Sequence, residues 1–437
     1  MSDSLFPLPD ARRPVVESAE APARVQRPNR TQLEFRPVDL ESVLPDDHRA
    51  RVVWEFVEGL DLGAFYEAIK AVEGHAGRPP IDPAILMALW LYATLEGVGS
   101  ARAVGRLCEE HDAYRWICGG VTVNYHTLAD FRVAQPERLD DLLTASVATL
   151  LAEELVELTR VAQDGVRVRA SAGGASFRRE ERLQQCLAAA ATQVMALREQ
   201  VDSDPGGPSR RQAAAQRRAA EERRRGVGQA LEQLPEFEAR RKKAGVKGRA
   251  RLSTTDPDAR VMKMPDSGFR PAFNVQFMTT TQGQIIVGVA VTNAGTDQGQ
   301  LGPMVEQVQQ RYGRAPTELL ADGGFVDLDD LRGLAQTAPG CQVYAPPKDR
   351  DDPTRPPVRR PDDPLIAAWR QRMQTEAGQA IYRERAATSE CVNAHARNRG
   401  LRQFLVRGLA RVRAAVLWYA LAQNVASGAR LRAAATM

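Results

Sequence analysis

The sequence predicts a mixed α and β protein: an all-α N-terminal segment, then a mixed β-sheet core with a basic helical insertion between its first and second strands. Two observations carry this prediction. Apolar residues recur at helical spacing from about residue 34 to 156, whereas β-type runs occur only at 157–163 and between 273 and 345. A long, polar, Ala- and Arg-rich helical stretch separates the first of these runs from the others.

The chain has 437 residues, which is too long for one ordinary core. Residues 1–33 are rich in proline and charge and predict a disordered arm. We expect these further divisions: a helical domain at 34–156, the first core strand at 157–177, the basic insertion at 178–252, the rest of the core at 253–430 and a tail at 431–437.

Several classes of protein are disfavoured by composition. The five cysteines are scattered without a CxxC pair, and the five histidines form no HxxxH pattern, so neither a disulfide framework nor a zinc site is expected. The N-terminus lacks the apolar core of a signal peptide. No apolar run reaches about 18 residues, so we expect no transmembrane span and a reduced cytoplasmic location.

The helical N-terminal segment contains strong helix-start signals. Asp82 precedes Pro83 before an apolar helix, and Ser100 follows a glycine turn before another helix. Helix, glycine turn, helix and a further polar helix resemble a helix-turn-helix arrangement, which predicts DNA binding. A helical domain without that role fits the same pattern, so both interpretations stay open here.

The basic insertion has an uneven charge. Between residues 209 and 251 there are 14 Lys and Arg against 5 Asp and Glu. Such a stretch is either a solvated helical hairpin or an arm that contacts phosphates. Its clusters have few acidic partners at i+4, which favours the phosphate-contacting interpretation. The predicted phosphate-binding residues are Arg223, Arg224, Arg225, Arg240, Arg241, Lys242 and Lys243.

Three acidic residues are candidates for a catalytic site. If 157–163 is a strand, Asp164 lies at its carboxyl end and Gly165 allows a tight exit. Asp322 follows a short strand and precedes two glycines, so neighbouring parallel strands would bring both carboxylates to one edge. Glu390 lies on a late helix at 382–395 that we expect to pack across that edge.

Three carboxylates without a histidine or cysteine cluster are the ligand set that a hard cation prefers. Two Mg²⁺ ions held in this way activate water or a 3′-hydroxyl against a phosphodiester and stabilise the leaving oxygen. Taken one at a time, these acids are more simply explained as turn formers or an exposed helix acid. Only the predicted arrangement, with two strand ends at one edge of the sheet and a helix across it, favours a metal site.

The chain also resembles a known family, the bacterial insertion-sequence transposases with a DDE triad and an InsH-type N-terminal helical domain. In the first part of the chain the similar segments are 89–93, 97–102 and 126–132. In the core they are Asp164-Gly165 with Arg167 and Arg169-Ala170, 253–259, 274–276, and 321–325 around Asp322. The resemblance implies an RNase H-like core.

The third family motif is Tyr, Arg, Glu and Lys along one helix. Here it reads Tyr382, Arg385, Glu390 and Arg397, so an arginine stands in place of the usual lysine. Cys391, Asn393 and Ala394 stand where Pro, Phe and Gly are frequent. In an unbroken helix the Tyr and both Arg would share one broad face, with Glu390 near its edge. The resemblance implies that Tyr382, Arg385 and Arg397 grip phosphates.

The resemblance implies an enzyme, a DDE transposase. It would bind the terminal inverted repeats of its element and catalyse metal-dependent cleavage and strand transfer. Asp164, Asp322 and Glu390 would hold two Mg²⁺ ions, with Mn²⁺ able to substitute. The partner is double-stranded DNA, at the element ends and the target, with a homodimer in the DNA complex, no membrane, and a place at the bacterial nucleoid. Two alternatives remain: a decayed transposase that acts as a DNA-binding repressor, and an RNase H-like nuclease without strand transfer.

Overall fold

The structure is a computed structural model that describes residues 39–67, 69, 79–203, 210–347 and 363–436. The predicted arm at 1–33 lies outside the described residues. From Leu40 onward the chain forms one compact unit. None of the helices in the described ranges combines the length and apolarity needed to span a bilayer.

The predicted helical N-terminal segment is confirmed. Its main helices are α1 (Arg49–Glu58), α2 (Gly63–Tyr66), α3 (Pro83–Leu95), α4 (Ala101–Glu110), α5 (Asp112–Cys118), α6 (Tyr125–Ala134) and α7 (Pro136–Ala152). Both expected caps form. The Asp82 carboxylate accepts from the Ala84 N–H at 2.8 Å, and the Ser100 hydroxyl accepts from the Ala103 N–H at 3.4 Å.

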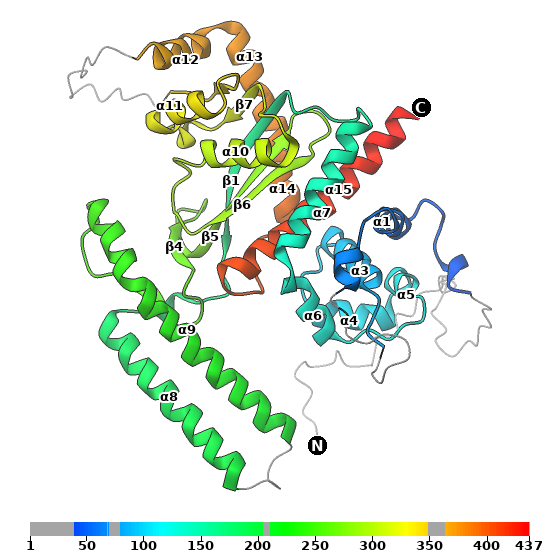
Figure 1. The fold of residues 1–437 in the computed structure, drawn as a ribbon, viewed down its shortest axis with the longest axis vertical. Helices are drawn as coiled ribbons and strands as arrows, with labels where there is room; N and C mark the ends of the chain where they lie inside the picture. The colour runs from blue at the N-terminus through cyan, green and yellow to red at the C-terminus, as the bar shows by residue number, and fades with distance from the viewer. Residues whose placement is uncertain (1–38, 68, 70–78, 204–209, 348–362, 437) are drawn as a thin grey trace, which may run out of the picture. The chain divides into compact units, whose positions relative to one another are not determined.

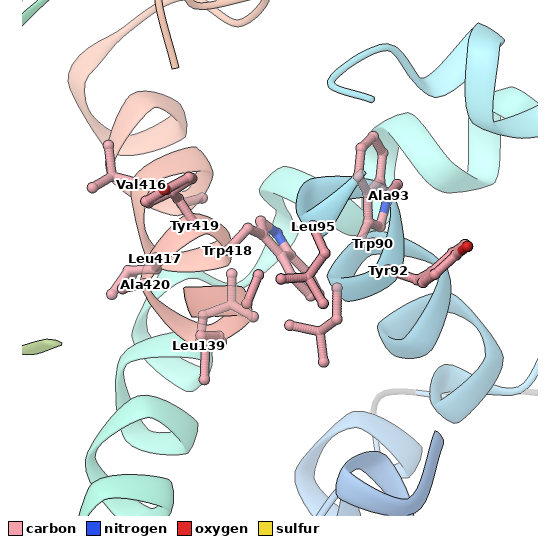
Figure 2. Packing of buried hydrophobic residues seen from close by; sticks show 14 of the residues in the cluster. Trp90, Tyr92, Ala93, Leu95, Leu139, Val416, Leu417, Trp418, Tyr419 and Ala420 are labelled. Carbon is pink, nitrogen blue, oxygen red and sulfur yellow. The ribbon is translucent and has the colours of Figure 1, made fainter. Parts of the chain in front are cut away.

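Helix α3 is apolar on nearly every side, so it must be enclosed by other elements. The C-terminal helix α15 (Leu409–Ala435) supplies much of that cover (Figure 1). Figure 2 shows Trp418 of α15 pointing toward the α3 side chains Leu95 and Trp90. The Trp418 indole N–H donates to the Arg132 carbonyl at 2.9 Å. One apolar core therefore joins the first helices of the chain to its last helix.

A six-stranded mixed sheet forms the second half of the chain, as predicted. Its strands are β1 (Arg160–Arg169), β4 (Arg260–Lys263), β5 (Phe269–Thr280), β6 (Ile286–Thr292), β7 (Glu318–Ala321) and β8 (Gln342–Tyr344). The β5–β6 hairpin lies antiparallel beside β1, with β5 paired directly to it. On its other side β1 pairs with β7 in parallel, and β7 pairs with β8 in parallel.

The bounds of the first strand differ from the sequence prediction. The strand runs from Arg160 to Arg169 rather than ending before Asp164. Asp164 pairs with Phe277 and Gly165 with Gln276, so the Asp-Gly pair continues the strand and makes no turn. The physical reason is that Val166 and Val168 are buried at alternate positions, and their burial favours extension of the strand.

The basic insertion is helical, as predicted. Helices α8 (Glu180–Ser203) and α9 (Arg210–Lys243) lie side by side along an apolar seam (Figure 1). The seam contains Leu183 and Leu234. The short strands β2 (Phe177–Arg178) and β3 (Leu252–Ser253) pair where the chain enters and leaves these helices. A hydrogen bond of 2.7 Å from the Gln233 amide to Asp258 also connects α9 to the segment before β4.

Helices α10 (Leu301–Tyr312), α11 (Leu328–Thr337) and α12 (Pro364–Gln374) follow the sheet strands. The prediction of a single helix at 382–395 is wrong in detail. The helix is divided into α13 (Glu376–Arg385), a five-residue π-helical segment (Ala386–Glu390) and α14 (Cys391–Asn398). A π-helix bonds residue i to i+5, so the segment changes which side chains share a face.

Candidate functional site

Asp164 lies within the sheet. By strand alternation its side chain shares a face with the buried Val166 and Val168 of β1. Its Oδ1 accepts from the Gly165 N–H at 2.9 Å, and its Oδ2 accepts from the Asn393 amide Nδ2 at 2.9 Å. Burial raises the pKa of the Asp164 carboxyl, while the nearby Arg385 guanidinium opposes that rise. The carboxylate is therefore held against helix α14 in an environment that disfavours its charge.

Asp322 directly follows β7 and is exposed. The last residue pair of the parallel β1–β7 ladder joins Gln163 to Ala321. Asp164 is the next residue of β1, and Asp322 is the first residue after β7. The parallel ladder therefore brings these two backbone positions to neighbouring places at the end of β7. The expectation of neighbouring parallel strands is confirmed.

Glu390 closes the π-helical segment. Its Oε1 accepts from the Arg385 Nη2 at 2.6 Å. Five residues separate this pair, a spacing that points side chains apart on an α-helix but together across a π turn. Asn393, three residues after Glu390, donates to Asp164, and residues at i and i+3 share one helix face. Asn393 and Arg385 therefore act directly on Asp164, whereas Glu390 is exposed and is connected to this group through Arg385.

The three acids nevertheless form no ready ligand set. Among the described residues, no group of three His, Cys, Asp or Glu side chains is close enough to hold a metal ion. Glu390 is engaged by Arg385, and Asp164 by Asn393. The donors that these acids offer are all oxygens, which suits a hard divalent cation. The donor chemistry fits, and gathering the donors requires Glu390 to leave Arg385.

The other motif residues have different surroundings. The Arg385 guanidinium lies over the Tyr382 ring, 5.7 Å from its centroid. Arg397 is exposed at the far end of α14. Glu384, the competing acid on α13, pairs with Arg160 at 2.5 Å and is thereby tied to β1. Of the two acids on this helix, Glu390 alone has a neighbour at i+3 that contacts Asp164.

The predicted phosphate-binding residues of α9 differ in their pairing. The side chains of Arg223, Arg224 and Arg225 are exposed and make no ion pair within the described ranges. Arg240 pairs with Glu236 at 2.5 Å, and Arg241 donates to the Lys247 carbonyl and lies over Phe237. Lys242 and Lys243 are exposed. How the hairpin lies relative to the three acids stays a prediction.

A buried polar cluster behind Asp164 was missed by sequence reasoning. On the opposite face of β1 and β5, the Asp297 Oδ1 accepts from the amides of Asn274 at 2.7 Å and Gln276 at 2.8 Å. Its Oδ2 accepts from Arg167 at 3.3 Å. A Cβ added to Gly165 would stand 2.4 Å from that Oδ1. Two polar residues at alternate positions of an otherwise apolar strand were the available signal.

Gly165→Ala is therefore expected to destabilise the protein by about 1–3 kcal/mol, as overpacking of a filled interior does. The new methyl group would also meet the Gln276 amide at 2.6 Å, so two buried neighbours must shift. Urea unfolding measures the change. Gly173→Ala is the control, because a Cβ there meets nothing within 4 Å. Equal stability of both variants would contradict this explanation of Gly165.

Comparison with known families gives two matches, both to transposases. A family model described as a transposase domain (DUF772) matches residues 38–134, the region of α1 to α6. A second model, described as a transposase DDE domain, matches residues 354–427, the region of α12 to α15 that includes Glu390. No curated protein and no solved structure matched the chain.

Two separate regions of the chain are thus similar to transposase domains, and these matches support a transposase function. Because the second match is to a DDE domain, the two together support an insertion-sequence transposase of the DDE type.

Proposed function

We propose that this transposase binds the terminal inverted repeats of its element, cuts DNA there, and joins the resulting 3′-hydroxyl to target DNA. One observation supports this proposal above all. Asp164 lies on β1, Asp322 directly follows the neighbouring parallel strand β7, and the helix of Glu390 is hydrogen-bonded to Asp164 through Asn393. Three elements that are far apart in the sequence thus carry the three acids into one region of the fold.

The core is RNase H-like in this proposal. Its support is the strand arrangement: an antiparallel hairpin beside β1 on one side, and two parallel strands with intervening helices on the other. In such open sheets, sites form where neighbouring parallel strands end. Asp322 lies at such an end.

Asp164, Asp322 and Glu390 would hold the divalent metal, two Mg²⁺ ions with Mn²⁺ as a substitute. When bound, the metal supplies activation of the attacking oxygen and stabilisation of the leaving oxygen. The protein's own groups position the DNA. Arg385 is held between a carboxylate and an aromatic ring, so an incoming phosphate can compete for its guanidinium. Tyr382 and Arg397 would grip the same DNA end.

Double-stranded DNA is the proposed partner, and α9 supplies much of its electrostatic attraction. Exposed arginines without acidic partners are free to replace the counterions of a phosphate backbone. The N-terminal helices would add recognition of the inverted repeats. We infer a homodimer in the DNA complex, since two ends must be paired, and action at the bacterial nucleoid.

Two alternatives compete with this function. A decayed copy that only represses would bind the ends without cutting them. A nuclease of the same fold would cut but not join. The retention of all three acids favours an active enzyme over a decayed copy that only represses.

The test is an assay with the purified full-length protein, Mg²⁺, labelled DNA that carries the element end, and a supercoiled target plasmid. The expected product is end DNA covalently joined to the plasmid. Cut ends without joining would favour the nuclease. Bound but uncut ends would favour the repressor.

A further inference from the structure

Asn393 of α14 is a buried polar residue, and it contacts the candidate site. Its side chain is only 3% exposed. Its amide nitrogen donates to Asp164 Oδ2 at 2.9 Å. The oxygen of the same amide, Oδ1, is buried and has no hydrogen-bond partner in the described part of the chain. A buried carbonyl oxygen without a hydrogen-bond partner is uncommon in native proteins, so it requires an explanation.

The orientation of this amide follows from its neighbour. A carboxylate only accepts hydrogen bonds, so the NH₂ group must face Asp164 and the oxygen must point elsewhere. Exchanging the two amide atoms would place two oxygens against each other. The unpartnered oxygen is therefore a consequence of the Asp164 contact, and it lies in the neighbourhood of that carboxylate.

The nearby groups narrow the choice of partner for this oxygen. Thr388 and Ser389 donate to the carbonyls of Glu384 and Arg385, so their hydroxyl protons are used. The Arg385 guanidinium donates to Glu390 instead. Glu390 lies three residues before Asn393 and is exposed, and its carboxylate brings only acceptors. A cation held by the neighbouring carboxylates is a partner that would satisfy the oxygen.

We propose that Asn393 is a fourth residue of the metal site and that its amide oxygen binds the divalent cation. This inference rests on the proposed function. Asparagine oxygens are ordinary ligands of hard cations. A neutral oxygen also has an electrostatic advantage here, because it completes the ligand set without adding a fourth negative charge to three carboxylates.

The test measures Mn²⁺ binding to the full-length protein without DNA, by titration calorimetry and by the rise in melting temperature that Mn²⁺ causes. Asn393→Leu is expected to raise the Mn²⁺ Kd by about tenfold or more, in the range seen when groups around a metal site are lost. Asn398→Leu makes the same chemical change at an exposed position of α14 and is expected to bind as the wild type does. Asp164→Asn is expected to weaken Mn²⁺ binding at least as much as Asn393→Leu does.

A second variant separates a ligand from a residue that only orients Asp164. Asn393→Asp loses the N–H donor but keeps an oxygen, and its Kd is expected to stay within about threefold of the wild type or to fall. Equal weakening by Asn393→Leu and Asn393→Asp would overturn the ligand role. If circular dichroism shows Asn393→Leu unfolded, Asn393→Ala replaces it with the same expectation.

Different results would overturn the proposed metal site and the proposed role of Asn393. Wild-type binding in Asn393→Leu, with loss in Asp164→Asn, overturns the role of Asn393 and leaves the metal site in place. Mn²⁺ binding that is absent, or unchanged by Asp164→Asn, overturns the proposed metal chemistry itself and the role of Asn393 with it.

Discussion

Asp164→Asn is expected to reduce the rate of DNA end cleavage with Mg²⁺ by roughly a thousandfold, or about 4 kcal/mol of transition-state stabilisation. The substitution keeps the size of the side chain, but its single amide oxygen can replace only one of the two acceptors that serve the Gly165 N–H and the Asn393 amide. What it removes is one negative oxygen from the proposed metal ligands. A single-turnover cleavage assay on DNA carrying the element end measures the change.

The same variant is expected to melt at an equal or higher temperature. Burial raises the pKa of Asp164 above its value in the unfolded chain, so the native state binds the proton more tightly. Stability linked to this group is therefore present at low pH and lost as pH rises through the raised pKa. At neutral pH the buried ionised carboxylate is destabilising, and its removal by asparagine offsets the loss of one hydrogen-bond acceptor. Loss of activity together with lower stability would indicate a structural role for Asp164.

Replacing Arg223, Arg224 and Arg225 together by glutamine is expected to weaken DNA binding by roughly tenfold to a hundredfold near physiological salt. These exposed arginines lack ion-pair partners among the described residues, so each can contact a phosphate. The slope of log affinity against log salt concentration should fall by about 2 to 3, since each phosphate contact contributes about 0.9. Fluorescence anisotropy at several salt concentrations measures both quantities.

A matched variant removes the same charge elsewhere. Arg270, Arg332 and Arg432 are surface arginines that pair with Asp266, Asp329 and Glu153. Their joint replacement by glutamine changes the net charge equally but leaves the paired acids behind. We expect a much smaller loss of affinity. If both triple variants weaken binding alike, α9 attracts DNA only through total charge and is not a contact surface.

Much of the core could be predicted because strong local patterns coincide with tertiary ones. The short strand predicted before Asp322 is present as β7, since its apolar run ends at an Asp-Gly-Gly sequence where the chain must turn. The insertion is also helical, as expected. In each of these segments a single periodicity continues without a competing signal.

Asp164 shows where local patterns mislead. An Asp-Gly pair is a turn signal by propensity, but here the glycine is required for a different reason. The Asp297 side chain approaches the strand so closely at Gly165 that no Cβ fits. Nothing near position 165 in the sequence reveals a residue more than a hundred positions later. The continued valine alternation was the one local indication that the strand went on.

The helix of the third motif shows a second limit. Counting residues on an ideal helix puts Glu390 near the edge of the face that carries Arg385. The π-helical segment instead allows the two side chains to pair, and brings Asn393 to Asp164. A π turn has no sequence pattern comparable with a cap or a glycine stop. The contribution of Asn393 therefore became evident only from its contacts.

The most direct test of the central claim, that Asp164, Asp322 and Glu390 carry out the DNA chemistry, compares two acids of the same helical region. Glu390→Gln and Glu384→Gln make the same change six residues apart, and Glu384 is already engaged by Arg160. In the strand-joining assay, Glu390→Gln is expected to give no joined product, whereas Glu384→Gln is expected to join close to the wild-type rate. Joining by Glu390→Gln at the wild-type rate would contradict the account.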